Sequence, residues 1–137
     1  MDDPPAVVVH GFAQACAVLR HGRPVTLLSA EGAGLYGGAG WWRALVAAAT
    51  AAVPDTPMRD ILDCADAPGA AMAALRLGQR LLVLDPVVPA FPAVAAAAAT
   101  MGGAVLATRP AALDLDQPGA LRRLPAWLAD DSADTPR

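Results

Sequence analysis

Five short apolar runs, each followed by a segment with helical spacing, constrain the fold of this chain more than any other feature. The runs are rich in valine and leucine, and the segments between them place apolar residues on one helical face. Glycine follows several of these segments at the position where a helix ends. The pattern predicts strands at 6–10, 24–29, 60–64, 80–85 and 104–108.

Strands that are apolar on both faces and joined by helices are typical of a parallel sheet covered on both sides. We therefore expect a three-layer α/β domain with a five-stranded parallel sheet, as in flavodoxin-like and Rossmann-like folds. Double winding in the order 2-1-3-4-5 covers all five strands. The length of 137 residues suits one domain, which we place at 1–128, with a disordered acidic tail at 129–137.

Charge and hydropathy exclude several classes of partner. The net charge is −3 and the basic residues are scattered, so no positive patch is predicted for nucleic acid. The N-terminus is acidic, where an export signal would be basic. The uncharged run at 86–108 is long enough to span a bilayer, but its prolines and its Gly102-Gly103 pair favour a helix followed by a strand. We expect a cytoplasmic protein without a membrane partner.

The two cysteines, Cys16 and Cys64, lie far apart and form no CxxC pair. Neither has a histidine nearby at the spacing of metal ligands, so the sequence predicts neither a disulfide framework nor a metal site. The sequence leaves the identity of any cofactor unknown.

A glycine-rich segment follows the second predicted strand and is the sharpest functional signal in the chain. Gly32, Gly34 and Gly37 match the GxGxxG pattern, and Gly38 and Gly40 follow. Bare glycine backbone and the N-terminus of a helix both suit a phosphate or another anion. A dinucleotide fingerprint requires the helix to begin inside the motif, whereas here we expect it to begin near Trp41. The segment therefore predicts an anion-binding loop, with a flexible surface loop as the structural alternative.

Polar residues also follow each predicted strand, at the edge where parallel sheets bind ligands. Arg109 is the candidate counter-charge for an anion, and we expect it near Asp85 because their strands are predicted neighbours. Candidates for catalysis are an imidazole base and three carboxylic acids at the same edge. They are His10, Glu31, Asp66 and Asp85.

Three functions remain open from the sequence. The first is a domain that binds a small anionic or phosphorylated ligand at the glycine-rich segment, with Arg109 as counter-charge. The second is a non-catalytic assembly module that forms homo-oligomers. Adjacent Trp41 and Trp42 point about 100° apart on a helix, so one is expected to be buried and the other exposed at such an interface. The third is a small lyase-like or hydrolase-like enzyme that uses the four catalytic candidates.

Overall fold

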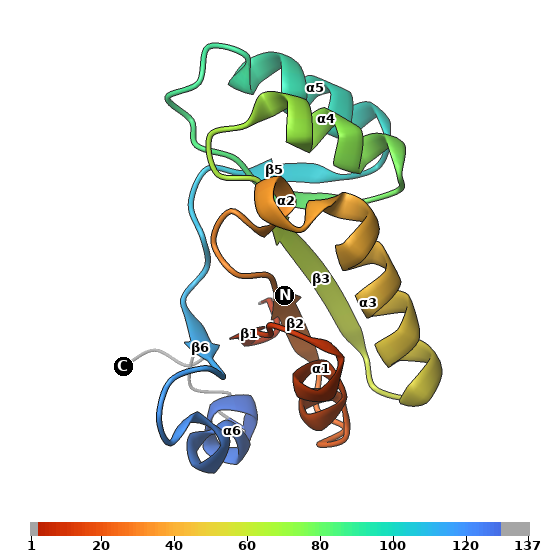
Figure 1. Ribbon diagram of the computed structural model, residues 1–137, viewed down its shortest axis with the longest axis vertical. Helices are drawn as coiled ribbons and strands as arrows, with labels where there is room; N and C mark the ends of the chain where they lie inside the picture. The colour runs from red at the N-terminus through yellow and green to blue at the C-terminus, as the bar shows by residue number, and fades with distance from the viewer. Residues whose placement is uncertain (1–2, 130–137) are drawn as a thin grey trace. The chain divides into compact units, whose positions relative to one another are not determined.

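The computed structural model describes residues 3–129, in which six strands and six helices alternate along most of the chain (Figure 1). The strands are β1 (Ala6–Val8), β2 (Val25–Leu28), β3 (Met58–Asp63), β4 (Leu81–Val83), β5 (Ala104–Leu106) and β6 (Ala112–Asp114). The helices are α1 (Phe12–Leu19), α2 (Ala33–Tyr36), α3 (Gly38–Ala52), α4 (Pro68–Arg76), α5 (Phe91–Thr100) and α6 (Ala120–Ala129).

Hydrogen bonds join the strands in the order β5-β4-β3-β2-β1-β6. The predicted α/β fold with a parallel sheet is confirmed, because β1 pairs in parallel with β2 and β6, and β4 pairs in parallel with β3 and β5. The prediction of five strands in the order 2-1-3-4-5 is wrong. The predicted order places β3 beside β1, whereas in the structure β3 lies beside β2, and β6 occupies the other edge of β1.

The sixth strand, β6, is the element that the sequence pattern misses. It has three residues, and only Leu113 among them is a large apolar side chain. Its partner is β1, at the other end of the chain, with Ala112 opposite Ala6 and Asp114 opposite Val8. Pairing of this kind is long-range, and local periodicity does not reveal it.

The described residues divide into two compact units, and α3 and β3 contribute to both. Unit 1 comprises 3–28, 46–60 and 111–129, and unit 2 comprises 29–45 and 61–110. In unit 1, β1 lies between β2 and β6 and is buried along its whole length. The indole Nε1 of Trp127 donates to the Ala6 carbonyl oxygen over 2.8 Å and so attaches α6 to β1.

In unit 2, α4 and α5 connect β3, β4 and β5 and lie side by side (Figure 1). Both connections step in the same direction, so right-handed crossovers place both helices on one face of these strands. Leu75 of α4 and Val94 of α5 are buried together with Leu62 and Leu82 of the strands. Burial on this scale contributes about 1.5–3 kcal/mol for each large apolar side chain.

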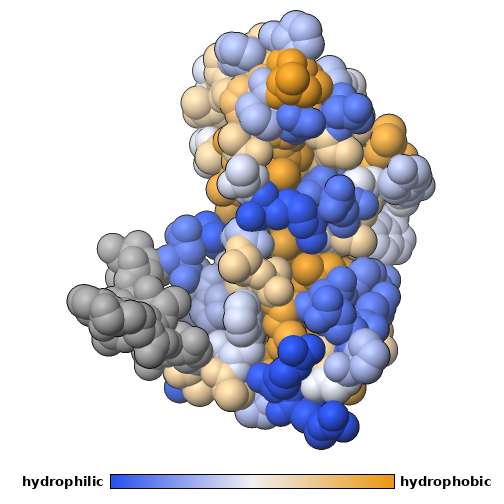
Figure 2. Space-filling view, turned by 90° about the vertical axis from the view of Figure 1, so that its left-hand side faces the viewer, coloured by the Kyte–Doolittle hydropathy of each residue, from blue (hydrophilic) through white to orange (hydrophobic). Residues whose placement is uncertain are grey.

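The uncharged run at 86–108 forms turns, α5 and β5 rather than one continuous helix. Within 3–129 no helix combines the length and the hydropathy that crossing a bilayer would need. Apart from Ala129, which ends α6, the predicted disordered tail lies outside the described residues. On the face shown in Figure 2, hydrophobic patches are interrupted by hydrophilic residues.

Candidate functional site

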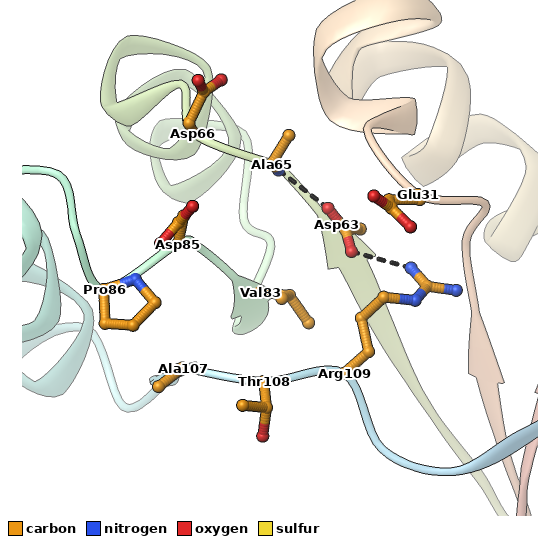
Figure 3. Close-up of a pocket in the computed structure, with 10 residues that line it drawn as sticks. All are labelled: Glu31, Asp63, Ala65, Asp66, Val83, Asp85, Pro86, Ala107, Thr108 and Arg109. Carbon is orange, nitrogen blue, oxygen red and sulfur yellow. Dashed lines mark hydrogen bonds and ion pairs between the residues drawn. The ribbon is translucent and has the colours of Figure 1, made fainter.

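A pocket of about 560 Å³ lies at the carboxyl ends of the strands of unit 2 (Figure 3). Parallel sheets place their ligands at this edge. The lining carries four carboxylates and one guanidinium, together with small and apolar residues. It consists of Glu31, Asp63, Ala65, Asp66, Val83, Asp85, Pro86, Ala107, Thr108 and Arg109.

Asp63, the last residue of β3, is the hydrogen-bonding centre of this pocket. Its side chain is 2% exposed, and its Oδ1 accepts hydrogen bonds from the backbone N–H groups of Ala65 at 2.8 Å and Gly32 at 3.2 Å. Its Oδ2 lies 2.7 Å from Nη1 of Arg109. The backbone N–H of Asp63 donates to the Ser29 hydroxyl over 2.9 Å. A buried charge needs this kind of complete pairing, so Asp63 forms a fixed wall of the pocket.

The other three carboxylates of the pocket have fewer partners. Asp85 accepts a 2.9 Å hydrogen bond from the Val87 N–H. Within residues 3–129, the ion pairs of the structure involve none of Glu31, Asp66 and Asp85, and all three residues are exposed. Figure 3 shows Asp66 and Asp85 on one side of the pocket, and Glu31, Asp63 and Arg109 on the other. The solvent-accessible charge of the lining is therefore mainly negative.

The glycine-rich segment is helical for most of its length. Residues 33–36 form α2, and α3 begins at Gly38 rather than near Trp41. Gly32 precedes α2 with φ of 74°, a left-handed conformation that glycine adopts without strain, and its N–H is bonded to Asp63. A Cβ on Gly34 would lie 2.9 Å from Sγ of Cys64 and 3.1 Å from the carbonyl oxygen of Asp63. Gly34 thus lets α2 approach the end of β3, which is a packing role.

Cys64 follows Asp63 and is fully buried. Burial, and secondarily the negative charge of Asp63, raise the pKa of the Cys64 thiol to about 12. A thiol with this pKa is protonated at neutral pH, and a protonated thiol is a poor nucleophile. The next residue, Ala65, has φ of 50°, a strained value for a residue with a side chain. Its N–H bond to Asp63 holds this conformation at the pocket wall.

The structure places the predicted site residues in three locations. Glu31, Asp66, Asp85 and Arg109 line the pocket. The glycines lie at the start of α2 and α3. The remaining candidate, His10, belongs to unit 1, where its Nε2 lies 2.7 Å from Oδ1 of Asp114.

Two details of the pocket differ from the sequence prediction. The strands that carry Asp85 and Arg109 are neighbours, as expected, but the ion pair of Arg109 in the structure is with Asp63. The sequence suggests Asp63 only as a possible ribose-binding acid and does not predict its central role in the hydrogen bonds of the pocket. Its signal in the sequence is an acid directly after the apolar pair Ile61-Leu62, and many acids at strand ends are only solvated.

Comparison of the chain with models of known protein families finds no match. Comparison with curated protein sequences finds none either.

Proposed function

We propose that this chain is a small-molecule-binding domain, and that its ligand occupies the pocket of unit 2. The observation that carries the proposal is a pocket of about 560 Å³ at the carboxyl ends of parallel strands, within the size range of ligand sites. Its lining combines apolar residues such as Val83 and Pro86 with a few charged groups from different strands. That combination is typical of a site that orients a ligand through a few polar contacts.

The charges of the pocket favour a ligand that offers hydrogen-bond donors, such as an ammonium group or several hydroxyl groups. Glu31, Asp66 and Asp85 are acceptors when ionised, and Arg109 is already paired with Asp63. A phosphate would meet repulsion from these carboxylates. The N–H of Gly32, predicted as part of an anion cradle, donates instead to the carboxylate of Asp63. Binding of an anionic ligand stays a prediction, but this geometry supports it less well.

A thermal-shift panel tests the proposal. It contains simple amines, amino acids, polyols, inorganic phosphate and sugar phosphates. A ligand present at 100 times its Kd stabilises the folded state by about 2.7 kcal/mol, which is easily measured as a rise in Tm. We expect Asp85→Asn and Asp66→Asn to reduce the shift, and Asp55→Asn, an exposed control in unit 1, to leave it unchanged. A panel without any shift in the wild type would contradict small-molecule binding.

Exposed apolar residues on α2 and α3 favour self-association as a second candidate function. Leu35 is 50% exposed, Tyr36 84% and Trp41 40%, and all three belong to unit 2. Aromatic residues are enriched at protein interfaces. A homo-oligomer that uses this surface would dissociate when Tyr36→Ser is combined with Trp41→Arg, as measured by light scattering after size exclusion. A monomeric wild type at high concentration would exclude this function.

Of the residues predicted for catalysis, only carboxylic acids lie in the pocket. Of the four candidates, Glu31, Asp66 and Asp85 line the pocket and His10 does not. Cys64 offers no activated thiolate, because its pKa is raised to about 12. We therefore place binding ahead of catalysis.

A further inference from the structure

A second cluster of polar side chains lies in unit 1, where β1 and β6 end. His10 follows β1, Asp114 ends β6 and Asp116 stands two residues later. Because β1 and β6 are parallel neighbours with Val8 opposite Asp114, their carboxyl ends meet and bring these three side chains together. Each of the three offers one ligand atom, and these atoms lie within 4.8 Å of one another.

Both ring nitrogens of His10 face carboxylates. Nε2 lies 2.7 Å from Oδ1 of Asp114, the length of a strong hydrogen bond, whereas Nδ1 lies 3.4 Å from Oδ2 of Asp116. A neutral imidazole has one N–H, and the short contact with Asp114 is the better placed of the two to use it. In that tautomer Nδ1 directs a lone pair at a carboxylate oxygen of Asp116, and a cation bound between these two atoms would be attracted by both.

The separation of 3.4 Å between Nδ1 of His10 and Oδ2 of Asp116 fits two ligands of one metal ion. Ligands that each lie about 2.1 Å from a tetrahedral Zn²⁺ stand roughly 3.4 Å apart. A direct hydrogen bond between the same two atoms would be shorter, as the Nε2 contact is.

The surrounding hydrogen bonds hold both side chains in this orientation. Gln14 Nε2 donates to Oδ1 of Asp116 over 2.8 Å, which leaves Oδ2 toward the imidazole. The Oε1 of the same Gln14 accepts a hydrogen bond from the backbone N–H of His10 at 2.7 Å. A ligating histidine commonly donates its other ring N–H to a carboxylate, and such contacts fix the ring and its tautomer; Asp114 Oδ1, 2.7 Å from Nε2, is in the position for this role.

We propose that His10, Asp114 and Asp116 form a binding site for a divalent transition-metal ion of the Zn²⁺ class. His10 Nδ1 and Asp116 Oδ2 are the ligands, and Asp114 holds the ring through Nε2. Imidazole together with carboxylate suits Zn²⁺, whereas Mg²⁺ and Ca²⁺ prefer oxygen ligands alone. Water completes the coordination of an ion at this partly exposed position. The site does not depend on the pocket of unit 2.

Isothermal titration calorimetry tests the site: Zn²⁺ is titrated into the full chain after a chelator has removed bound metal. We expect one ion per chain, and a loss of affinity of more than about tenfold in both His10→Gln and Asp116→Asn. His21→Gln is the matched control, because His21 is an exposed histidine of the same unit, and its affinity should equal that of the wild type. Substitution with Co²⁺ gives a second readout, namely the visible bands of a tetrahedral nitrogen and oxygen site without thiolate charge transfer.

Two results would overturn the site. A wild type that takes up no Zn²⁺ would show that a proton alone bridges His10 and Asp116. Equal Zn²⁺ affinity in the wild type and both variants would place the ion elsewhere. Circular dichroism must show that the variants are folded, and Asp116→Asn is the safer of the two, because the Asp116 side chain is 58% exposed.

Discussion

Asp63 and Arg109 form an ion pair that reaches across β4. Asp63 ends β3, Arg109 follows β5, and β4 lies between these two strands in the sheet. Strands two positions apart are roughly 9–10 Å from each other, so only a long side chain spans the distance. The Nη1–Oδ2 separation of 2.7 Å fixes the segment after β5 against the end of β3, along one side of the pocket.

Asp63→Asn should lower the stability of the chain while leaving the shape of the side chain unchanged. The amide still accepts hydrogen bonds at Oδ1, but the charge that pairs with Arg109 is lost. We expect a loss of about 1.5–3 kcal/mol in the free energy of unfolding, the range for hydrogen bonds to charged groups. Urea denaturation measures it. Asp66→Asn, an exposed neighbour, should change stability by less than about 0.5 kcal/mol, and equal losses in the two variants would contradict the role given to Asp63.

Gly34→Ala should destabilise the chain by about 1–3 kcal/mol, because its Cβ would contact Cys64 and the Asp63 carbonyl oxygen. Adding Cys64→Ala removes the nearest atom, Sγ, so the double variant should lose less than the sum of the two single variants. Gly40→Ala is the control. Its Cβ would meet nothing within 4 Å, and it should gain about 0.5–1 kcal/mol as a helical alanine. If the loss of stability in the double variant equals the sum of the losses in the two single variants, α2 does not pack on Cys64.

The Cys64 thiol should be unreactive in the folded chain. It is fully buried and its pKa is raised to about 12, so a thiol-specific reagent at neutral pH should label it only after denaturation. Because the folded-state pKa exceeds the ordinary value of 9.0, unfolding releases a proton at high pH. The contribution of Cys64 to stability is therefore complete below about pH 9 and declines as the pH rises toward about 12. Cys64→Ala should flatten this alkaline decline, and fast labelling of Cys64 in the native wild type would refute the assignment.

The adjacent tryptophans should differ sharply in their effect on stability. Trp42 is 0% exposed and Trp41 is 40% exposed, which confirms that one ring is buried and the other is not. Trp42→Ala should cost about 3–5 kcal/mol. Trp41→Ala should cost about 1–2 kcal/mol, since much of its ring stays in water. Acrylamide quenching of the fluorescence of each single variant identifies the exposed ring, and stronger quenching of Trp42 than of Trp41 would reverse the assignment.

Local pattern was sufficient for most of the elements and for part of the pocket. The runs around β1, β2, β4 and β5 were predicted because buried strands are apolar on both faces. Glu31, Asp66, Asp85 and Arg109 were predicted at one edge because parallel strands end together. These inferences need only residues that are close in sequence.

The features that the sequence pattern did not predict, namely the strand order, β6 and the contact of His10 with Asp114, depend on pairing between residues far apart in the chain. The order of the strands depends on which edge each new strand joins, and no local signal states that β6 joins β1. Likewise, the contact between His10 and Asp114 spans 104 positions. The helical form of 33–36 was hidden because glycine and alanine there match a loop motif equally well.

The position of β6 beside β1 has a consequence for the order in which the chain folds during synthesis. Residues 29–110 contain all of unit 2, so that unit can fold before the last segment leaves the ribosome. Unit 1 cannot, because one edge of β1 stays without its partner until Ala112–Asp114 has been made. A nascent chain stalled before this point would present an apolar strand edge, a form in which strands associate between molecules. Pairing of β6 with β1 therefore removes this exposed strand edge and the risk of association that comes with it.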